Sequence, residues 1–161
     1  MARGSLNAEE KQVLKLIASG HDTLCNVVDY MGWIVPEAVI VIDRLEMEGY
    51  IRRAGSFGSE YLRFVLTEKG YQVIEELPET EKEFIYKYGL SKEDVDILKA
   101  ASELGRAQSD NEHLTAKTGY SGMQVVASIE NLEKKGYLRQ FGWVRRRVAV
   151  TPQGEKMIKA G

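Results

Sequence analysis

The strongest chemical signal in this sequence is a run of arginines near its C-terminus. Residues alternate in the segment 143–150, WVRRRVAV, so Val148 and Val150 are expected to face inward while alternate arginines point to the opposite side. Guanidinium groups bind phosphate oxygens through paired N–H donors. The residues expected to contact a phosphate backbone are the arginines of this run, one on the facing strand and the aromatic residue at the tip: Arg139, Trp143, Arg145, Arg146 and Arg147. The alternative is that the arginines are solvated strand residues.

Residue types needed for catalysis or metal binding are scarce. The two histidines, His21 and His113, do not lie near Cys, Asp or Glu at the spacing of metal ligands. No glycine-rich loop ends in Lys-Ser or Lys-Thr, and GSFG at 55–58 is typical of a hairpin turn. Cys25 lies in an apolar stretch and is expected in the core, and a single cysteine cannot form an intrachain disulfide. We therefore expect no enzyme, no metal and no cofactor.

Length and composition allow two small domains. A chain of 161 residues with 43% hydrophobic content can bury one medium core or two small ones of about 70 to 80 residues each. The longest apolar stretch, 33–42, is interrupted by Pro36 and Glu37, and the N-terminus lacks an apolar signal segment, so we expect a cytoplasmic protein without a membrane span. Residues 1–77 carry 8 basic and 12 acidic side chains, whereas residues 90–161 carry 12 and 9. This asymmetry predicts different partners for the two halves.

Three landmarks recur in the same order in both halves. They are LNAEEKQVLKLI from residue 6 with LSKEDVDILKAA from residue 90, RLEMEGYIRR from 44 with NLEKKGYLRQ from 131, and LTEKG from 66 with VTPQG from 150. The second copy has three more residues before its LE-x-x-GY element and three fewer after it. Loops absorb such differences, so one structural unit is expected twice.

Each copy is expected to contain helices and a hairpin in a fixed order. The first helix begins at a capping box, Asn7 with Glu10 in one copy and Ser91 with Asp94 in the other. The second and third helices are expected at 22–30 and 36–48, and at 110–118 and 122–135. The third helices end at Gly49 and Gly136, hairpins follow, and the last helices open at Thr67 and Thr151.

This order predicts a mainly α protein with small β-hairpins, of the α+β class. The expected parts are a first domain at 1–77, a linker helix at 78–89 and a second domain at 90–161. We expect the linker to be helical and packed against a domain because Phe84, Ile85 and Tyr88 share one helical face. A solvated linker is the alternative.

The two copies resemble the winged helix-turn-helix superfamily over nearly the whole chain. The resemblance is carried by LTAKTGYSGMQVVASIENLEKKGYLRQ and by the looser CNVVDYMGWIVPEAVIVIDRLEMEGYIRR. It implies two tandem winged-helix domains of a DNA-binding transcription regulator of prokaryotic type, in which the third helix enters the major groove. Winged helices in general bind duplex DNA, and a sizeable minority bind RNA or other proteins.

In the second copy, the resemblance places outward residues of the third helix against base edges. Val125, Ile129 and Leu132 form the buried stripe of this helix. The outward residues expected to bind nucleic acid are Ser121, Gln124, Ser128 and Asn131, of which the amides suit adenine and the hydroxyls suit phosphate or base. The alternative is that they are ordinary polar surface residues.

The third helix of the first copy differs in chemistry. Its outward side combines acidic and aliphatic residues, which are unfavourable against phosphates and typical of a protein interface, including a homodimer seam. The residues expected at this interface, on the helix and on the linker, are Ile40, Val41, Arg44, Met47, Phe84 and Ile85.

Three functions remain open. The leading expectation is a DNA-binding transcriptional regulator that uses the second copy and dimerises through the first copy or the linker. The second is a protein-interaction adaptor built from tandem winged helices. The third is structured-RNA binding, because LTEKG followed by ELPE is similar to a stretch in the N-terminal winged-helix region of archaeal and eukaryotic phenylalanyl-tRNA synthetase alpha subunits.

Overall fold

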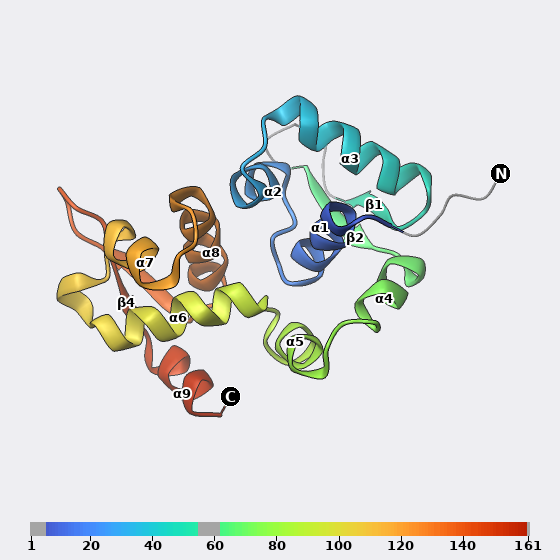
Figure 1. Cartoon of the computed structure of the whole chain (residues 1–161). Coiled ribbons are helices and arrows are strands. Elements are labelled where there is room, and N and C mark those ends of the chain that lie inside the picture. Colours follow the sequence, from blue (N-terminus) through green and yellow to red (C-terminus); the bar gives the residue numbers. More distant parts are fainter. Residues whose placement is uncertain (1–5, 55–61, 161) are drawn as a thin grey trace. The chain divides into compact units, whose positions relative to one another are not determined.

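The computed structural model describes residues 6–54 and 62–160. Over these residues the protein is mainly helical, with two small antiparallel sheets of two strands each (Figure 1), which confirms the α+β class. The chain divides into two units, one made of residues 1–28 and 33–88, the other of residues 29–32 and 89–161. The expected GSFG turn at 55–58 lies outside the described residues.

The first half of the chain forms its helices and hairpin in the predicted order. The elements are α1 (Ala8–Ala18), α2 (Leu24–Met31), α3 (Val35–Met47), β1 (Ile51–Ala54), β2 (Arg63–Leu66), α4 (Glu68–Ile74), α5 (Glu79–Glu83) and a π-helical turn η2 (Phe84–Tyr88). Strands β1 and β2 pair antiparallel, with Ile51 opposite Leu66. The segment expected as a linker helix forms α5 and η2 and belongs to the first unit.

The second half repeats this order. The elements are α6 (Lys92–Leu104), a 3-10 turn η3 (Arg106–Gln108), α7 (Asn111–Thr118), α8 (Gly122–Lys134), β3 (Leu138–Phe141), β4 (Arg147–Val150) and α9 (Pro152–Ala160). Strands β3 and β4 pair antiparallel, with Leu138 opposite Val150. Helix α6 packs against α7, α8, α9 and β4, so it is central to the second unit.

Capping boxes begin the first helix of each copy, as predicted. The Asn7 side chain accepts a hydrogen bond from the backbone N–H of Glu10, whose carboxylate accepts from the backbone N–H of Asn7. Ser91 and Asp94 make the same two bonds at α6. Two backbone donors that lack helical acceptors are therefore satisfied at each helix start.

The repeated LE-x-x-GY element is the C-terminal cap of the third helix. In the first copy Tyr50 N–H donates to the Leu45 carbonyl and Gly49 N–H to that of Glu46, which is the Schellman pattern. Tyr137 and Gly136 donate to Leu132 and Glu133 in the same way. The glycines have φ of +82° and +86°, a region that side chains disfavour, so both copies need glycine there.

The repeated T-x-x-G element ties the last helix to this cap. In the second copy Thr151 N–H donates to the Tyr137 carbonyl, and the Thr151 hydroxyl donates to the Gly136 carbonyl and accepts from Gly154 N–H. Thr67 makes the equivalent bonds in the first copy. The last two landmarks thus form one junction, which holds the two ends of each hairpin together.

Each third helix buries the predicted stripe. Val125, Ile129 and Leu132 are buried in α8, and in α3 the corresponding buried residues are Ala38, Ile42 and Leu45. Two other predictions about burial are wrong. Ile85, expected at a protein interface, is a buried residue of η2, and Cys25, expected in the core, is exposed.

Over residues 6–54 and 62–160, no single helix has the length and hydropathy to cross a membrane. The pair α2 and α3, bent by 114° at the break between them, reaches those values only when counted together.

Candidate nucleic-acid interface

The β3–β4 hairpin presents an apolar tip to solvent. Phe141 pairs with Arg147 at the last position of the ladder, and Trp143 and Val144, which lie between the strands, are fully exposed. Gly142 has φ of +101°, and a Cβ atom there would lie too close to the Arg145 carbonyl oxygen. The tight turn therefore requires glycine at this position.

Inside the hairpin, the predicted alternation holds only in part. Val148 is buried as predicted, but Ala149 beside it is also buried and Val150 is only half-buried. The strand is covered by more than one element, because α6, η3 and α9 all pack against β4. Arg147 is half-buried as a result, whereas Arg139, Arg145 and Arg146 are exposed.

Arg145 is held by carboxylates of α7, which the sequence did not reveal. Its guanidinium lies 3.2 Å from Asp110 Oδ2 and 3.7 Å from Glu112 Oε2. Asp110 caps α7: its side chain accepts from the His113 backbone N–H and contacts the His113 ring. These hydrogen bonds, the backbone one above all, lower the pKa of Asp110. Arg145 thus connects the hairpin to the start of α7.

Backbone contacts strengthen the same connection. Val148 N–H donates to the Ser109 carbonyl at 3.0 Å, and Asp110 forms an isolated β-bridge with Arg147. The base of the hairpin therefore has a fixed position relative to α7 in this unit.

The remaining arginines have no such partners. Within the part of the chain that the structure describes, no carboxylate lies at ion-pair distance from Arg139, Arg146 or Arg147. An exposed guanidinium without a carboxylate keeps its donors for a phosphate. The predicted arginine cluster thus splits into the paired Arg145, the exposed and unpaired Arg139 and Arg146, and the half-buried Arg147, which also lacks a carboxylate partner among the described residues.

Helix α8 exposes less of its polar side than predicted. Ser121 is an exposed N-cap that accepts from the Gln124 backbone N–H, and Gln124 itself is half-buried. Ser128 and Asn131, however, are 0% and 1% exposed, so the prediction that they face outward is wrong. The Asn131 amide instead donates to Asp94 Oδ2 at 2.9 Å.

The reason is that α8 is covered on three sides. It packs against α6, α7 and β3, so a broad arc of the helix is buried, whereas the predicted stripe defined only its centre. The outward arc begins at Met123, which the helical periodicity also predicts to face outward, and continues through Glu130 and Glu133. The Glu133 carboxylate accepts from both the backbone N–H and the side-chain amide of Gln140 on β3.

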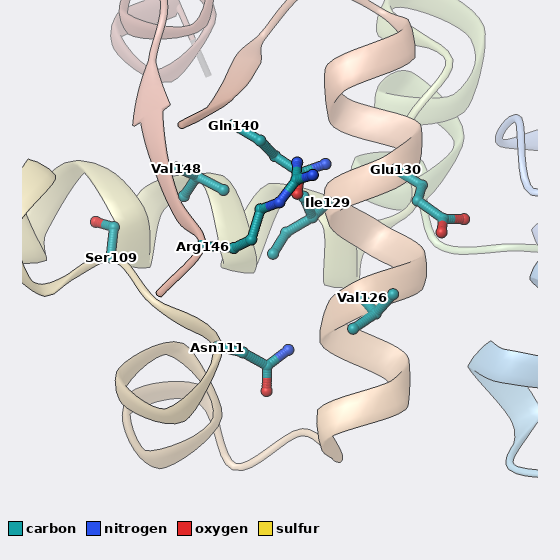
Figure 2. A pocket seen from close by; sticks show the side chains of 8 residues that line it. All are labelled: Ser109, Asn111, Val126, Ile129, Glu130, Gln140, Arg146 and Val148. Atoms are coloured by element: carbon teal, nitrogen blue, oxygen red, sulfur yellow. The ribbon is translucent and has the colours of Figure 1, made fainter. Parts of the chain in front are cut away.

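A cavity of about 230 Å³ lies between α8, the hairpin and the start of α7 (Figure 2). Its walls are Val126, Ile129 and Val148 on the apolar side and Ser109, Asn111, Glu130, Gln140 and Arg146 on the polar side. Figure 2 shows Arg146 and Gln140 reaching the cavity from the hairpin, whereas the Glu130 carboxylate points away across α8. Arg146 therefore lies where the hairpin and α8 face each other.

The first unit has a different surface. Ile40 and Met47 on α3 are 61% and 87% exposed, as predicted, and Val41 is half-buried. Arg44 is exposed with a guanidinium nitrogen 3.8 Å from Glu10, and Phe84 is half-buried. Apolar side chains in such exposed positions on a helix are typical of interfaces.

Arginines of the first hairpin are paired within their own unit. Arg53 contacts Asp43 at 2.9 Å and Glu46 at 3.1 Å, and Arg63 contacts Asp22 at 2.8 Å. Three carboxylates thus compensate two of the cations that the first hairpin could offer to phosphates. The first copy is therefore less suited than the second to binding a polyanion.

Comparison with models of known protein families gives no match, and comparison with curated proteins finds no relative.

Proposed function

We propose that each unit is a winged helix-turn-helix domain and that the second binds duplex DNA, as part of a cytoplasmic transcriptional regulator. Two features support the fold proposal, namely the repeated order of three helices, a hairpin and a last helix, and the helix caps shared by both copies. In such a domain the hairpin is the wing and α8 is the helix that lies in the major groove.

The observation that carries the DNA proposal is the β3–β4 hairpin. It projects a fully exposed Trp143 at its tip and carries Arg139, Arg146 and Arg147, which have no carboxylate partners among the described residues. Phosphate contacts of this kind position a protein on DNA and supply most of its salt-dependent affinity. Arg145 has a different role here: its ion pairs with α7 orient the hairpin.

Base contacts in this proposal come from the start of α8. Ser121 and Gln124 lie in its first turn, and Met123 between them is 52% exposed, so these side chains reach a groove before the rest of the helix does. Glu130 and Glu133 further along disfavour close approach of phosphates to the C-terminal half.

The test is fluorescence anisotropy with a labelled DNA duplex across a salt series. The variant Arg139→Ala/Arg146→Ala/Arg147→Ala should bind more weakly, and the slope of log affinity against log salt should fall by about three units because three phosphate contacts are lost. The control variant Lys99→Ala/Lys156→Ala/Lys159→Ala removes the same charge from exposed positions on α6 and α9 and should keep the wild-type slope.

Equal slopes for the arginine variant and the wild type would refute the proposal. Displacement of the duplex by an equal mass of transfer RNA, with the same three arginines required, would instead assign the hairpin to RNA.

A second candidate function, protein interaction, has its own support in α3. Ile40 and Met47 are exposed apolar residues on a helix whose neighbouring carboxylates, Asp43 and Glu46, disfavour phosphate. This surface is suited to a protein partner and is independent of the second unit.

A further inference from the structure

The exposed face of α3 forms a narrow apolar line. With 100° between successive residues, Pro36, Ile40 and Met47 fall within about 40° of one direction, opposite the buried Ala38 and Ile42. Ile40 lies near the middle of the line and Met47 at one end. A line of this width along a helix matches the contact made by two paired helices.

We propose that this face pairs with α3 of a second copy of the same chain, antiparallel and centred between Ile40 and Val41. The proposal names the partner for the α3 surface given above as a second candidate function. It is independent of DNA binding by the second unit.

Charge complementarity determines both the partner and the direction. Glu37 and Arg44 are seven residues apart and therefore lie on the same flank of the apolar line. When two such helices run antiparallel about a twofold axis between Ile40 and Val41, each Glu37 meets Arg44 of the second copy. The seam then contains this ion pair twice. In a parallel pair, the flank with Glu37 and Arg44 would instead face the opposite flank of the second copy, which carries Asp43, so the ion pair between Glu37 and Arg44 could not form.

Existing contacts leave both groups accessible. Among the residues that the structure describes, Glu37 accepts a single hydrogen bond, of 3.4 Å, from the Ile34 backbone N–H. Arg44 lies 3.8 Å from Glu10 and remains exposed. The opposite flank carries Asp43, whose charge is compensated by Arg53 of its own unit at 2.9 Å. The seam therefore brings no uncompensated acidic group against the second copy.

The size of the seam predicts a weak dimer. Helix α3 has 13 residues and is about 20 Å long, so it contributes less than a standard interface of about 1,600 Å². We expect dissociation in the micromolar range, which sedimentation velocity can follow from about 1 to 500 μM.

Charge reversal tests the pairing directly. Ile40→Glu should raise the dissociation constant of the dimer about a hundredfold because it places a charge in both halves of the apolar line. Glu37→Arg and Arg44→Glu should each weaken the dimer about tenfold, and the double variant should return it to within about threefold of wild type. Lys159→Glu, a reversal at an exposed position on α9, serves as the control and should leave the constant unchanged.

Cross-linking tests the direction of pairing. In a Cys25→Ser background, Ile40→Cys should form an intermolecular disulfide under mild oxidation, because this position faces its own copy. Met47→Cys should not, because the two cysteines would lie about 20 Å apart along the seam and a disulfide needs Cα atoms within about 7 Å.

A monomer at every concentration, an Ile40→Glu dimer as tight as wild type, or a charge-reversed double variant no tighter than the singles would each overturn the proposal. No DNA is present in these measurements, so their failure and failure of the DNA proposal are separate results.

Discussion

Replacing Gly154 with alanine should break the junction between the hairpin and the last helix. Gly154 is the third residue of α9, and its N–H donates to the Thr151 hydroxyl. A Cβ atom at this position would lie closer than 3.0 Å to the Tyr137 carbonyl oxygen and to Cγ1 of Val150. The carbonyl cannot move away freely, because it accepts the Thr151 N–H bond that holds the junction.

Opposing contributions set the size of the effect. Forcing a methyl group into a closely packed site costs about 1 to 3 kcal/mol. Losing the Thr151 to Tyr137 hydrogen bond costs about 1 kcal/mol more. Replacing glycine with alanine recovers about 0.4 to 1 kcal/mol, because it reduces the conformational entropy of the unfolded chain. The net expectation is a loss of about 2 kcal/mol, which lowers the unfolding midpoint of the second unit by about 10 °C.

Thermal unfolding followed by circular dichroism at the helical minimum measures this change. Gly122→Ala is the matched control, since Gly122 is also near a helix start but a Cβ there would meet only Asn111 Oδ1 at 3.4 Å, an ordinary contact. The control should be neutral or stabilising by about 0.5 kcal/mol. Gly70→Ala, at the equivalent position of α4, should lower the midpoint of the first unit instead, because its Cβ would approach the Tyr50 carbonyl oxygen.

The reasoning would be refuted if Gly154→Ala and Gly122→Ala changed stability by the same amount. That result would mean that the backbone at the junction yields to a side chain, and that the repeated T-x-x-G pattern has another cause.

Two further predictions concern buried polar groups of the second unit. The pKa of Asp110 is lowered in the folded state, so the charged carboxylate stabilises the fold above its unfolded pKa of about 3.9, and this contribution is lost as the pH falls below that value. The free energy of unfolding of Asp110→Asn should therefore fall less steeply in acid than that of the wild type. Urea denaturation between pH 5 and 3, about one unit either side of that pKa, measures this, and the same pH dependence in both proteins would contradict it. Asn131→Ala should cost about 1 to 3 kcal/mol in urea denaturation, because the buried Asp94 carboxylate loses a donor. The folded variant should keep the wild-type affinity for DNA, whereas loss of a base-contacting asparagine would lower the affinity and leave the stability unchanged.

Local signals in the sequence predicted most of the scaffold. Capping pairs, the glycine after each third helix and the threonine before each last helix act within a few residues, so their order along the chain is enough to place them. The buried stripe of α8 could be predicted for the same reason, since helical periodicity depends only on spacing.

Contacts between distant segments could not be predicted in this way. Arg145 was expected to be open to phosphate because nothing near it in sequence is acidic, yet the fold brings Asp110 and Glu112 beside it. Asn131 looked like a surface residue because the Asp94 that it contacts lies in α6, which is two helices earlier. Whether a polar residue reaches solvent or a buried partner depends on packing that periodicity does not encode.

The junction at Tyr50 and Tyr137 also makes the helices of each unit structurally independent of the hairpin. The same bond from a threonine hydroxyl to a glycine carbonyl spans 18 residues in the first copy and 15 in the second. Both hairpins thus connect to the helices through the same junction, whatever their length or charge. One hairpin can therefore become longer, and the other richer in arginine, in the course of evolution without any change in the helices to which they are attached.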